Sequence, residues 1–184
     1  MQLDFSTLTP LEAYRWLAST VTPRPIAWVS SLSASGVANL APFSFFQVIS
    51  DDPPTLMVNV GSRDDGSLKD TLRNVQATGQ LVIHLVGAAQ AETMNATSAW
   101  LPHGVSEIET VGIPTVSSVR VAPPRIASDR QGAPTRARQV GSVAAGPDRA
   151  TRVFGGSTAT AGAGGVCGWT CCVVETSVAP ISPR

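Results

Sequence analysis

The chain has 184 residues, with 13 basic and 13 acidic side chains and a formal net charge of zero. Balanced charge argues against a general nucleic-acid binder. No apolar run approaches the roughly 18 residues that a membrane helix needs, and the N-terminal stretch MQLDFSTLTP lacks the basic residues of a secretory signal. We therefore expect a cytoplasmic protein with no nucleic-acid and no membrane partner.

The first predicted element is a helix that begins near residues 9–12. Thr9 is a good N-cap, Pro10 suits the first helical position, and Glu12 completes a capping box. Apolar side chains then recur at helical spacing. We expect this helix to end by Thr20.

Three extended segments follow, at residues 25–33, 38–50 and 55–61. They are rich in β-formers, and the third is apolar enough to be buried. Pro42 lies inside the second segment and predicts either an edge strand or a break in the ladder. The short turns between the segments favour antiparallel pairing.

A second capping pattern, Ser67-Leu68-Lys69-Asp70, predicts a helix with Ser67 as its cap and Gly79 at its end. We then expect a strand, a short helix and a fifth strand at residues 80–86, 89–100 and 115–121. This order predicts a mainly β fold with flanking helices, namely an antiparallel barrel rather than a doubly wound parallel sheet. No glycine-rich dinucleotide or P-loop motif is present.

No side-chain pattern for a nucleophilic triad, a metal site or a carboxylate pair stands out. His84 falls in an apolar strand and is expected to be structural, and His103 is expected in a loop. The three cysteines, Cys167, Cys171 and Cys172, lie near the C-terminus without a nearby histidine, which is a weak zinc signal. We therefore predict no catalytic side chain and no metal ligand.

Two cationic side chains remain as candidates for binding an anion. Lys69 is the only lysine. It is expected in the first turn of a helix, where it opposes the helix dipole unless an anion lies nearby. With the hydroxyls of Ser67 and Thr71, this helix start predicts a phosphate site. A solvated surface lysine is the alternative. Arg24 lies between two prolines that stiffen its backbone, and it either supplies a charge near a ligand or anchors the first helix.

Four short elements, RPIAWVS (24–30), NLAPFSFF (39–46), DPP (52–54) and KDT (69–71), occur in an order and spacing that resemble one family. Over residues 9–126 the chain resembles the flavin reductase-like, FMN-binding split-barrel family. The resemblance implies a six-stranded antiparallel split barrel with outer helices, and a homodimer with FMN near its interface. It also implies NAD(P)H as electron donor and a partner oxygenase or another acceptor.

The resemblance also implies which residues contact the flavin. The strand after Arg24 runs beside the flavin, the segment from Asn39 to Ser44 wraps the isoalloxazine, and the KDT element lies on the phosphate side. The implied cofactor-binding residues are Arg24, Ser30, Asn39, Leu40, Ala41, Pro42, Phe43, Ser44, Ser50, Lys69 and Thr71.

The implied function is an FMN-binding oxidoreductase that passes electrons from NAD(P)H to flavin and on to an acceptor. Such an enzyme needs no acid–base pair, because the flavin carries the hydride chemistry. The alternatives are a flavin-binding protein without turnover and an inactive product of a frameshifted gene.

The composition changes near the end of the resemblance. Residues 1–126 contain 12 Leu and 6 Ile and have a net charge of −3, whereas residues 127–184 contain no Leu, one Ile, 9 Gly and 10 Ala and have a net charge of +3. We therefore predict a partial split-barrel domain at 1–128, incomplete at its C-terminus. Residues 129–184 are predicted to be an atypical Gly/Ala/Arg-rich tail, either frameshifted or disordered.

Overall fold

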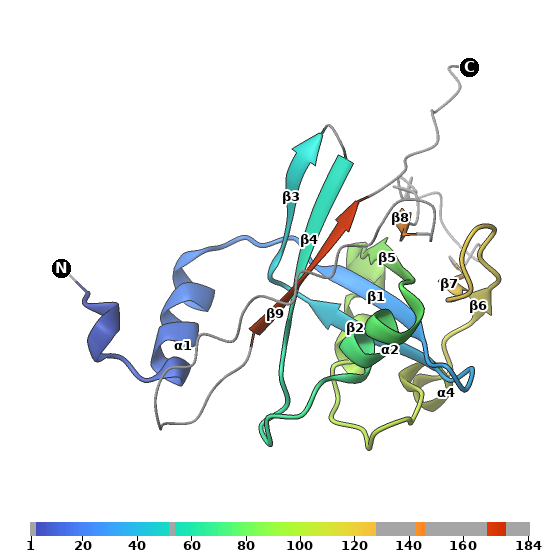
Figure 1. The fold of residues 1–184 in the computed structure, drawn as a ribbon, viewed down its shortest axis with the longest axis horizontal. Helices are drawn as coiled ribbons and strands as arrows, with labels where there is room; N and C mark the ends of the chain where they lie inside the picture. The colour runs from blue at the N-terminus through green and yellow to red at the C-terminus, as the bar shows by residue number, and fades with distance from the viewer. Residues whose placement is uncertain (1–2, 52–53, 128–142, 146–168, 176–184) are drawn as a thin grey trace.

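Strands make up most of the regular structure, with short helices beside them (Figure 1). The computed structural model describes residues 3–51, 54–127, 143–145 and 169–175. The helical segments are η1 (Phe5–Thr7), α1 (Pro10–Thr20), α2 (Asp70–Thr78), η2 (Ala88–Gln90), α3 (Ala91–Ala96) and α4 (Glu107–Val111). The strands are β1 (Ala27–Leu32), β2 (Ala38–Phe43), β3 (Phe46–Asp51), β4 (Pro54–Gly61), β5 (Leu81–Leu85), β6 (Thr115–Val116), β7 (Arg125–Ile126), β8 (Val143–Ala145) and β9 (Trp169–Glu175).

All strand pairs are antiparallel, as predicted from the short turns. In the part of the chain that the structure describes, they form a four-stranded sheet in the order β2-β1-β5-β8, a three-stranded sheet in the order β3-β4-β9, and the pair β6-β7. No hydrogen-bonded ladder joins the two larger sheets within the described residues. The fold is therefore mainly β with flanking helices, and its barrel is not closed.

The extended segment predicted at 38–50 is two strands rather than one. The chain bends at residues 44–45, between β2 and β3, and passes there from the first sheet to the second. Strand β2 is the edge of the four-stranded sheet, which confirms the expectation drawn from Pro42. Proline cannot donate to a ladder, so it is tolerated where one side of the strand has no neighbour.

Two apolar clusters hold the sheets and helices together. In one, side chains of β1, β4 and β5 pack with Leu72 and Val75 of α2. In the other, Trp28 of β1 packs with Leu40 of β2 and Ile108 of α4. Side chains alternate across β1, so this strand supplies both clusters, one from each face.

Helix α1 begins and ends where the sequence predicts. Thr9 and Glu12 form both hydrogen bonds of the capping box, and the helix ends at Thr20. The helix lies apart from the sheets, at the left of Figure 1, and none of its residues is buried in the described part of the chain. Its large apolar side chains are instead exposed, at Leu11 (56%), Tyr14 (41%), Trp16 (37%) and Leu17 (44%).

The predicted cap of the second helix is wrong. Helix α2 begins at Asp70, and its N-cap is Lys69 rather than Ser67, with no side-chain hydrogen bond at the cap. Ser67 belongs to the preceding turn instead, where its backbone N–H donates to Asp65 and its carbonyl accepts from the N–H of Arg63. Local turn formation has therefore moved the helix start by two positions.

Later elements are shorter than predicted. The helix expected over 89–100 comprises η2 and α3 and ends at Ala96, and the strand expected over 115–121 is only β6. Helix α4 was not predicted at all. Ser106 caps it by accepting from the N–H of Glu109, and Gly112 ends it with φ 74°. No helix among the described residues is long and apolar enough to cross a membrane.

Two strands come from the stretch predicted as an atypical tail. Strand β8 pairs with β5, and β9 pairs with β4 over seven positions, from Thr55↔Glu175 to Gly61↔Trp169. The remaining residues of 129–184, with Cys167 among them, and the loop residues Asp52 and Pro53 lie outside the described residues. The frameshift or disorder of the tail stays a prediction.

Candidate functional site

A pocket of about 150 Å³ lies where four elements meet: the edge strand β2, the start of α2, the loop after α3 and the start of α4. Its lining combines apolar surface from β2 with two cations and two carboxyl groups. The lining residues are Asn39, Ala41, Pro42, Phe43, Arg63, Lys69, Asp70, Thr71, Thr97, Ser98, Ala99, Trp100, Leu101 and Glu107.

The β2 side of the pocket is the edge of a sheet, where a side chain accepts a hydrogen bond from one outward-facing backbone N–H. The N–H of Leu40 donates to Oε2 of Glu107 at 3.0 Å. This N–H therefore points away from β1, and by the alternation of an antiparallel ladder the backbone of Pro42 faces the same way. Proline has no N–H there to leave unpaired. The outer edge of β2 thus offers carbonyl oxygens beside a proline ring.

The side chain of Glu107 is buried against this edge, with the residue 8% exposed. Burial raises the pKa of Glu107, although the hydrogen bond from the N–H of Leu40 acts in the opposite direction. The charge of Arg63 also favours the ionised form. The pocket therefore holds one carboxyl group that gains a proton more readily than an exposed glutamate.

The start of α2 supplies the second side of the pocket. The amide of Asn39 donates to the hydroxyl of Thr71 at 3.0 Å and so fixes the helix start against β2. A second amide on α2, that of Asn74, donates to Ser31 of β1 at 3.1 Å. Both bonds are buried, so the N-terminal turn of α2 is held rigidly at the pocket.

Lys69 is a half-buried cation at this helix start. Its ammonium lies 5.8 Å from the centre of the Phe43 ring, within the range of a cation–π contact. Burial lowers the pKa of Lys69 and the positive charge of Arg63 lowers it further, whereas the negative charge of Asp64 acts in the opposite direction. A desolvated cation beside another cation and a helix N-terminus is a place where an anion is stabilised.

Asp70 links three parts of the pocket wall. Its carboxylate lies 3.5 Å from the guanidinium of Arg63 and accepts from the backbone N–H of Gly104 at 3.2 Å. His103 contacts the same carboxylate through Nδ1, and its other ring nitrogen faces Arg73. His103 is thus in a loop, as predicted, and it contacts two side chains of α2. The carboxylate fastens the loop at residues 103–104 to α2.

The loop after α3 is hydrogen-bonded to the core at one residue and exposed to solvent at another. The indole N–H of Trp28 donates to the hydroxyl of Thr97 at 2.9 Å, and this bond is buried. Three residues later Trp100 is 66% exposed. The guanidinium carbon of Arg63 lies 5.2 Å from the centre of its ring. An exposed aromatic ring is therefore held at the mouth of the pocket.

Six of the eleven cofactor-binding residues expected from the sequence line this pocket. They come from two places far apart in the chain, β2 and the start of α2, which the Asn39–Thr71 hydrogen bond joins. The six are Asn39, Ala41, Pro42, Phe43, Lys69 and Thr71.

The other five expected residues lie elsewhere in the structure. Leu40 is fully buried behind the lining, and Ser44 lies at the bend between the sheets. The hydroxyl of Ser30 donates to the carbonyl of Pro124 at 2.6 Å. Ser50 lies near the end of β3. None of these is part of the described pocket lining.

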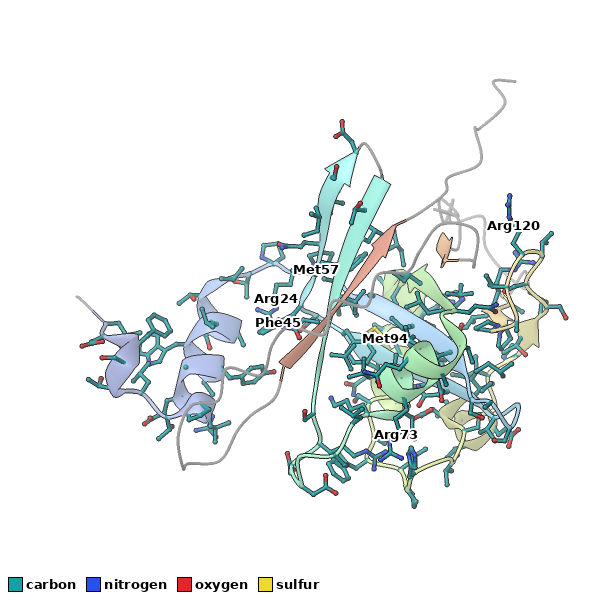
Figure 2. The ribbon with its side chains drawn as sticks, viewed as in Figure 1. Arg24, Phe45, Met57, Arg73, Met94 and Arg120 are labelled. Atoms are coloured by element: carbon teal, nitrogen blue, oxygen red, sulfur yellow. The ribbon has the colours of Figure 1, made fainter. Side chains whose placement is uncertain are left out.

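Arg24, the fifth, is engaged with helix α1. Its guanidinium donates to the carbonyls of Ala18 and Val21, the second at 2.6 Å, and lies 5.7 Å from the centre of the Phe45 ring. Figure 2 shows Arg24 and Phe45 next to each other beside the helix. These contacts of Arg24 are those expected if it anchors the first helix, which was the alternative to a charge near a ligand.

Several lining residues were missed by sequence reasoning. One local signal was available, because the pattern from Ser106 to Glu109 followed by Gly112 is typical of a capped helix and would have located Glu107. Arg63 and Trp100 lie in loops, and nothing in their neighbouring sequence indicates that the two meet.

The arrangement can hold a planar, partly polar ligand that carries an anionic group. Pro42 and Phe43 offer apolar surface, the β2 edge and Asn39 offer polar groups, and Lys69 with the N-terminus of α2 offers positive potential. Within the described residues, no cluster of three or more metal-ligating side chains occurs.

Residues 19–146 match the family described as "Flavin reductase like domain". An uncharacterised protein of Halalkalibacterium halodurans is 42% identical over 130 residues, which cover 71% of this chain and 62% of that protein. The chain spans 62%, 58% and 60% of the length of three curated relatives that it matches.

Two solved structures share both fold and sequence with the chain. The 2-nitrobenzoate 2-nitroreductase NbaA of Pseudomonas fluorescens is 34% identical with a TM-score of 0.62, over 70% of this chain and 60% of NbaA. Nitrilotriacetate monooxygenase component B of Bacillus cereus is 25% identical with a TM-score of 0.75, over 96% of this chain and 78% of that protein.

Proposed function

Because this chain belongs to the flavin reductase-like family, we propose that it binds FMN and passes electrons from NAD(P)H through the flavin to an acceptor. The observation that carries the proposal is the pocket beside β2, where Lys69 lies desolvated at a helix start whose cap makes no side-chain hydrogen bond. A cation at a helix N-terminus opposes the helix dipole, and a bound anion would offset this.

The residues present fit the phosphate end of a flavin nucleotide. The first N–H groups of α2 point out of the helix start, and Thr71 adds a hydroxyl. Lys69 supplies the charge, and Arg63 adds a second cation close enough to lower the pKa of Lys69. These groups would hold the phosphate, which carries the negative charge that the oxidised ring system lacks.

The β2 edge fits the ring system. Pro42 and Phe43 provide apolar surface for a planar ring, and the backbone of β2 provides polar groups at its rim. The pocket volume of about 150 Å³ is smaller than the roughly 300–1,000 Å³ of sites that enclose a whole ligand. The chain would therefore cover part of the nucleotide, and a second surface would complete the site.

The bound flavin would supply the hydride chemistry. The side chains of the pocket would bind and orient the flavin. Lys69 and Thr71 would contact its phosphate, and Asn39 would hold the start of α2 against β2. No step requires an acid–base pair from the protein. The buried carboxyl group of Glu107 keeps the β2 edge in place through Leu40.

A homodimer is the second part of the proposal. The exposed apolar side chains of α1 form a surface that a second copy of the chain would cover, and closure of the split barrel and completion of the pocket would accompany it. An oxygenase that receives reduced flavin is the proposed partner. This agrees with the similarity to a protein described as a monooxygenase component.

The test is a titration of the purified full chain with FMN and with FAD, followed by flavin fluorescence and visible absorbance. We expect saturable binding of FMN, at least about tenfold weaker in Lys69→Gln, because a charge-assisted phosphate contact is worth about 1.5–3 kcal/mol. Arg120→Gln, at an exposed position in the loop between β6 and β7, is the matched control and should bind normally.

Oxidation of NADH or NADPH that depends on added FMN then separates an enzyme from a flavin-binding protein without turnover. Light scattering on the same samples reports the dimer. If the folded full chain binds neither FMN nor FAD, the proposed function is wrong.

A further inference from the structure

Glu107 is a buried carboxyl group at the edge of the pocket. It lines the pocket from the first residue of α4, is 8% exposed, and accepts a hydrogen bond from the N–H of Leu40 at 3.0 Å. In the described part of the chain, the ion pairs join Asp70 to Arg63 and to His103, and none involves Glu107. Among these residues, the negative charge of the Glu107 carboxylate therefore has no cation in direct contact.

We propose that the charge of Glu107 weakens the binding of reduced flavin relative to oxidised flavin and so favours the departure of reduced flavin to an acceptor. The inference rests on the proposed flavin function and goes beyond it, because it assigns the selection between the two redox states to one side chain. Glu107 acts here through its charge, and not as an acid or a base.

The charged groups of the pocket lining lie in two places. Arg63, Lys69 and Asp70 belong to the loop before α2 and to the start of this helix. Glu107 contacts β2 instead, through the outward N–H of Leu40. Because the proposed function assigns the phosphate to the cations at α2, the ring system along β2 is the part of the nucleotide that lies beside Glu107.

Reduction changes the charge of the ring and leaves the charge of the phosphate as it was. A hydride from NAD(P)H carries one proton and two electrons, so the nicotinamide becomes positively charged and the neutral oxidised ring gains a hydrogen and one negative charge. Charges in a buried site are screened less than in water, so a carboxylate beside the ring opposes the added negative charge. The neutral oxidised ring meets no such repulsion. Ionised Glu107 therefore discriminates between the two states.

Several groups act on the ionisation of Glu107. Burial raises the pKa of Glu107, while hydrogen bonds from two backbone N–H groups and the charge of Arg63 act in the opposite direction. Lys69 and Asp70 are the other titratable groups of the described lining, to which β2 and the loop after α3 contribute none. On α4 itself, Glu109 is exposed.

The discrimination between redox states consequently depends on pH. It is present where Glu107 is ionised, above the pKa that this group has in the folded chain. It is lost as the pH falls through that pKa and the carboxyl group gains a proton. The phosphate titrates in both redox states of the flavin, so the ratio of the two affinities removes its contribution.

The experiment measures the dissociation constants of the full chain for oxidised FMN and for chemically reduced FMN in the absence of oxygen, by flavin fluorescence and absorbance. Glu107→Gln removes the charge and keeps an oxygen that can accept from the N–H of Leu40, so a purely structural role is preserved. At about pH 8, this variant should bind reduced FMN about tenfold more tightly relative to oxidised FMN than the wild type does, since a nearby like charge shifts an ionisation by about one pKa unit. A tenfold change raises the two-electron midpoint potential of bound FMN by about 30 mV.

Glu109→Gln is the matched control, because it removes the same charge from an exposed position on the same helix. It should leave the ratio of the two dissociation constants as in the wild type. An unchanged ratio in Glu107→Gln, or an equal change in Glu109→Gln, overturns the inference.

The pH profile of the wild type decides the case in which Glu107→Gln does not fold. A ratio of the reduced to the oxidised dissociation constant that falls between about pH 8 and about pH 5 supports the inference. A ratio that is constant or rises over this range overturns it. Thermal unfolding of each variant shows whether a change in binding is only a loss of structure.

The binding of oxidised FMN separates this inference from the proposed function. If the folded chain binds neither form of FMN, the proposed function is wrong and the role of Glu107 fails with it. If oxidised FMN binds and the ratio does not depend on Glu107, the inference fails alone, and the carboxyl group only fastens α4 to β2.

Discussion

Both ring nitrogens of His84 are engaged inside the fold. Nδ1 lies 2.9 Å from the carbonyl of Trp28, and Nε2 lies 3.1 Å from the backbone nitrogen of Ile126. A carbonyl can only accept and an N–H can only donate, so the ring is neutral, with its proton on Nδ1. The side chain thus ties β1, β5 and β7 together. The structural role predicted for His84 from the sequence is confirmed.

This geometry predicts a pH dependence of stability. Burial lowers the pKa of His84 below its ordinary value of 6.5, so the unfolded chain binds this proton more readily than the folded chain. The stabilisation from neutral His84 is therefore present above about pH 6.5 and is lost as the pH falls through the folded pKa. Denaturant unfolding between about pH 7.5 and about pH 5 should show a falling free energy of unfolding.

The control for this prediction is a variant in which His84 does not titrate. His84→Gln should make the free energy of unfolding depend less steeply on pH. His103→Gln reports any contribution of the other histidine to this dependence. An identical slope in wild type and His84→Gln would contradict the assignment.

The elements around the pocket are positioned by a few buried hydrogen bonds more than by their own sequence. The loop after α3 has one such bond, from Trp28 to Thr97, and α2 has two, from Asn39 to Thr71 and from Asn74 to Ser31. The predicted Ser67 cap shows the limit of local patterns. The capping motif was present at 67–70, but a competing turn took up Ser67 and left Lys69 at the helix start.

The anchoring role of Thr97 can be tested by removing its hydroxyl. Thr97→Val keeps the shape of the side chain but leaves the buried indole N–H of Trp28 without its acceptor, which should lower the free energy of unfolding by about 1–3 kcal/mol. Thr97→Ser keeps a hydroxyl and should recover most of the loss. Chemical denaturation followed by circular dichroism measures both.

Thr20 provides the comparison for this variant. Its hydroxyl donates to the carbonyl of Trp16 on exposed α1, so Thr20→Val removes a similar bond outside the core. If Thr20→Val lowers the free energy of unfolding as much as Thr97→Val does, the effect is not specific to the pocket loop.

At the scale of the whole molecule, the two larger sheets each end on a strand from the C-terminal stretch. Strand β9 lies along β4, and β8 lies along β5 (Figure 1). Without them β4 and β5 would be edge strands with unpaired backbone groups, and such edges promote aggregation. The stretch after residue 128 therefore contributes to both sheets, although its composition predicts little structure.

A truncation after residue 128 tests this contribution. We expect the shortened chain to aggregate or to lose cooperative unfolding, because seven backbone pairs along β4 and three along β5 are removed. Light scattering and denaturant unfolding compare it with the full chain. A monomeric fragment that unfolds cooperatively would mean that residues 1–128 form a self-sufficient domain.

The proposal that the tail derives from a shifted reading frame is tested separately. Sequencing the gene across codon 129 should show a single-base change that restores a leucine-containing, strand-like continuation. An intact frame would leave a genuine Gly/Ala/Arg-rich segment.

The sequence by itself determined the elements whose signals are local. The capping box of α1, the edge position of Pro42 and the strands at 55–61 and 80–86 follow from residues that interact with near neighbours. Tertiary structure alone decided what depends on distant contacts: the bend that divides 38–50 between two sheets, the place of Arg24 against α1, and the meeting of Arg63 with Trp100. Hydrogen-bonding side chains in loops have many partners available, and only the folded chain selects among them.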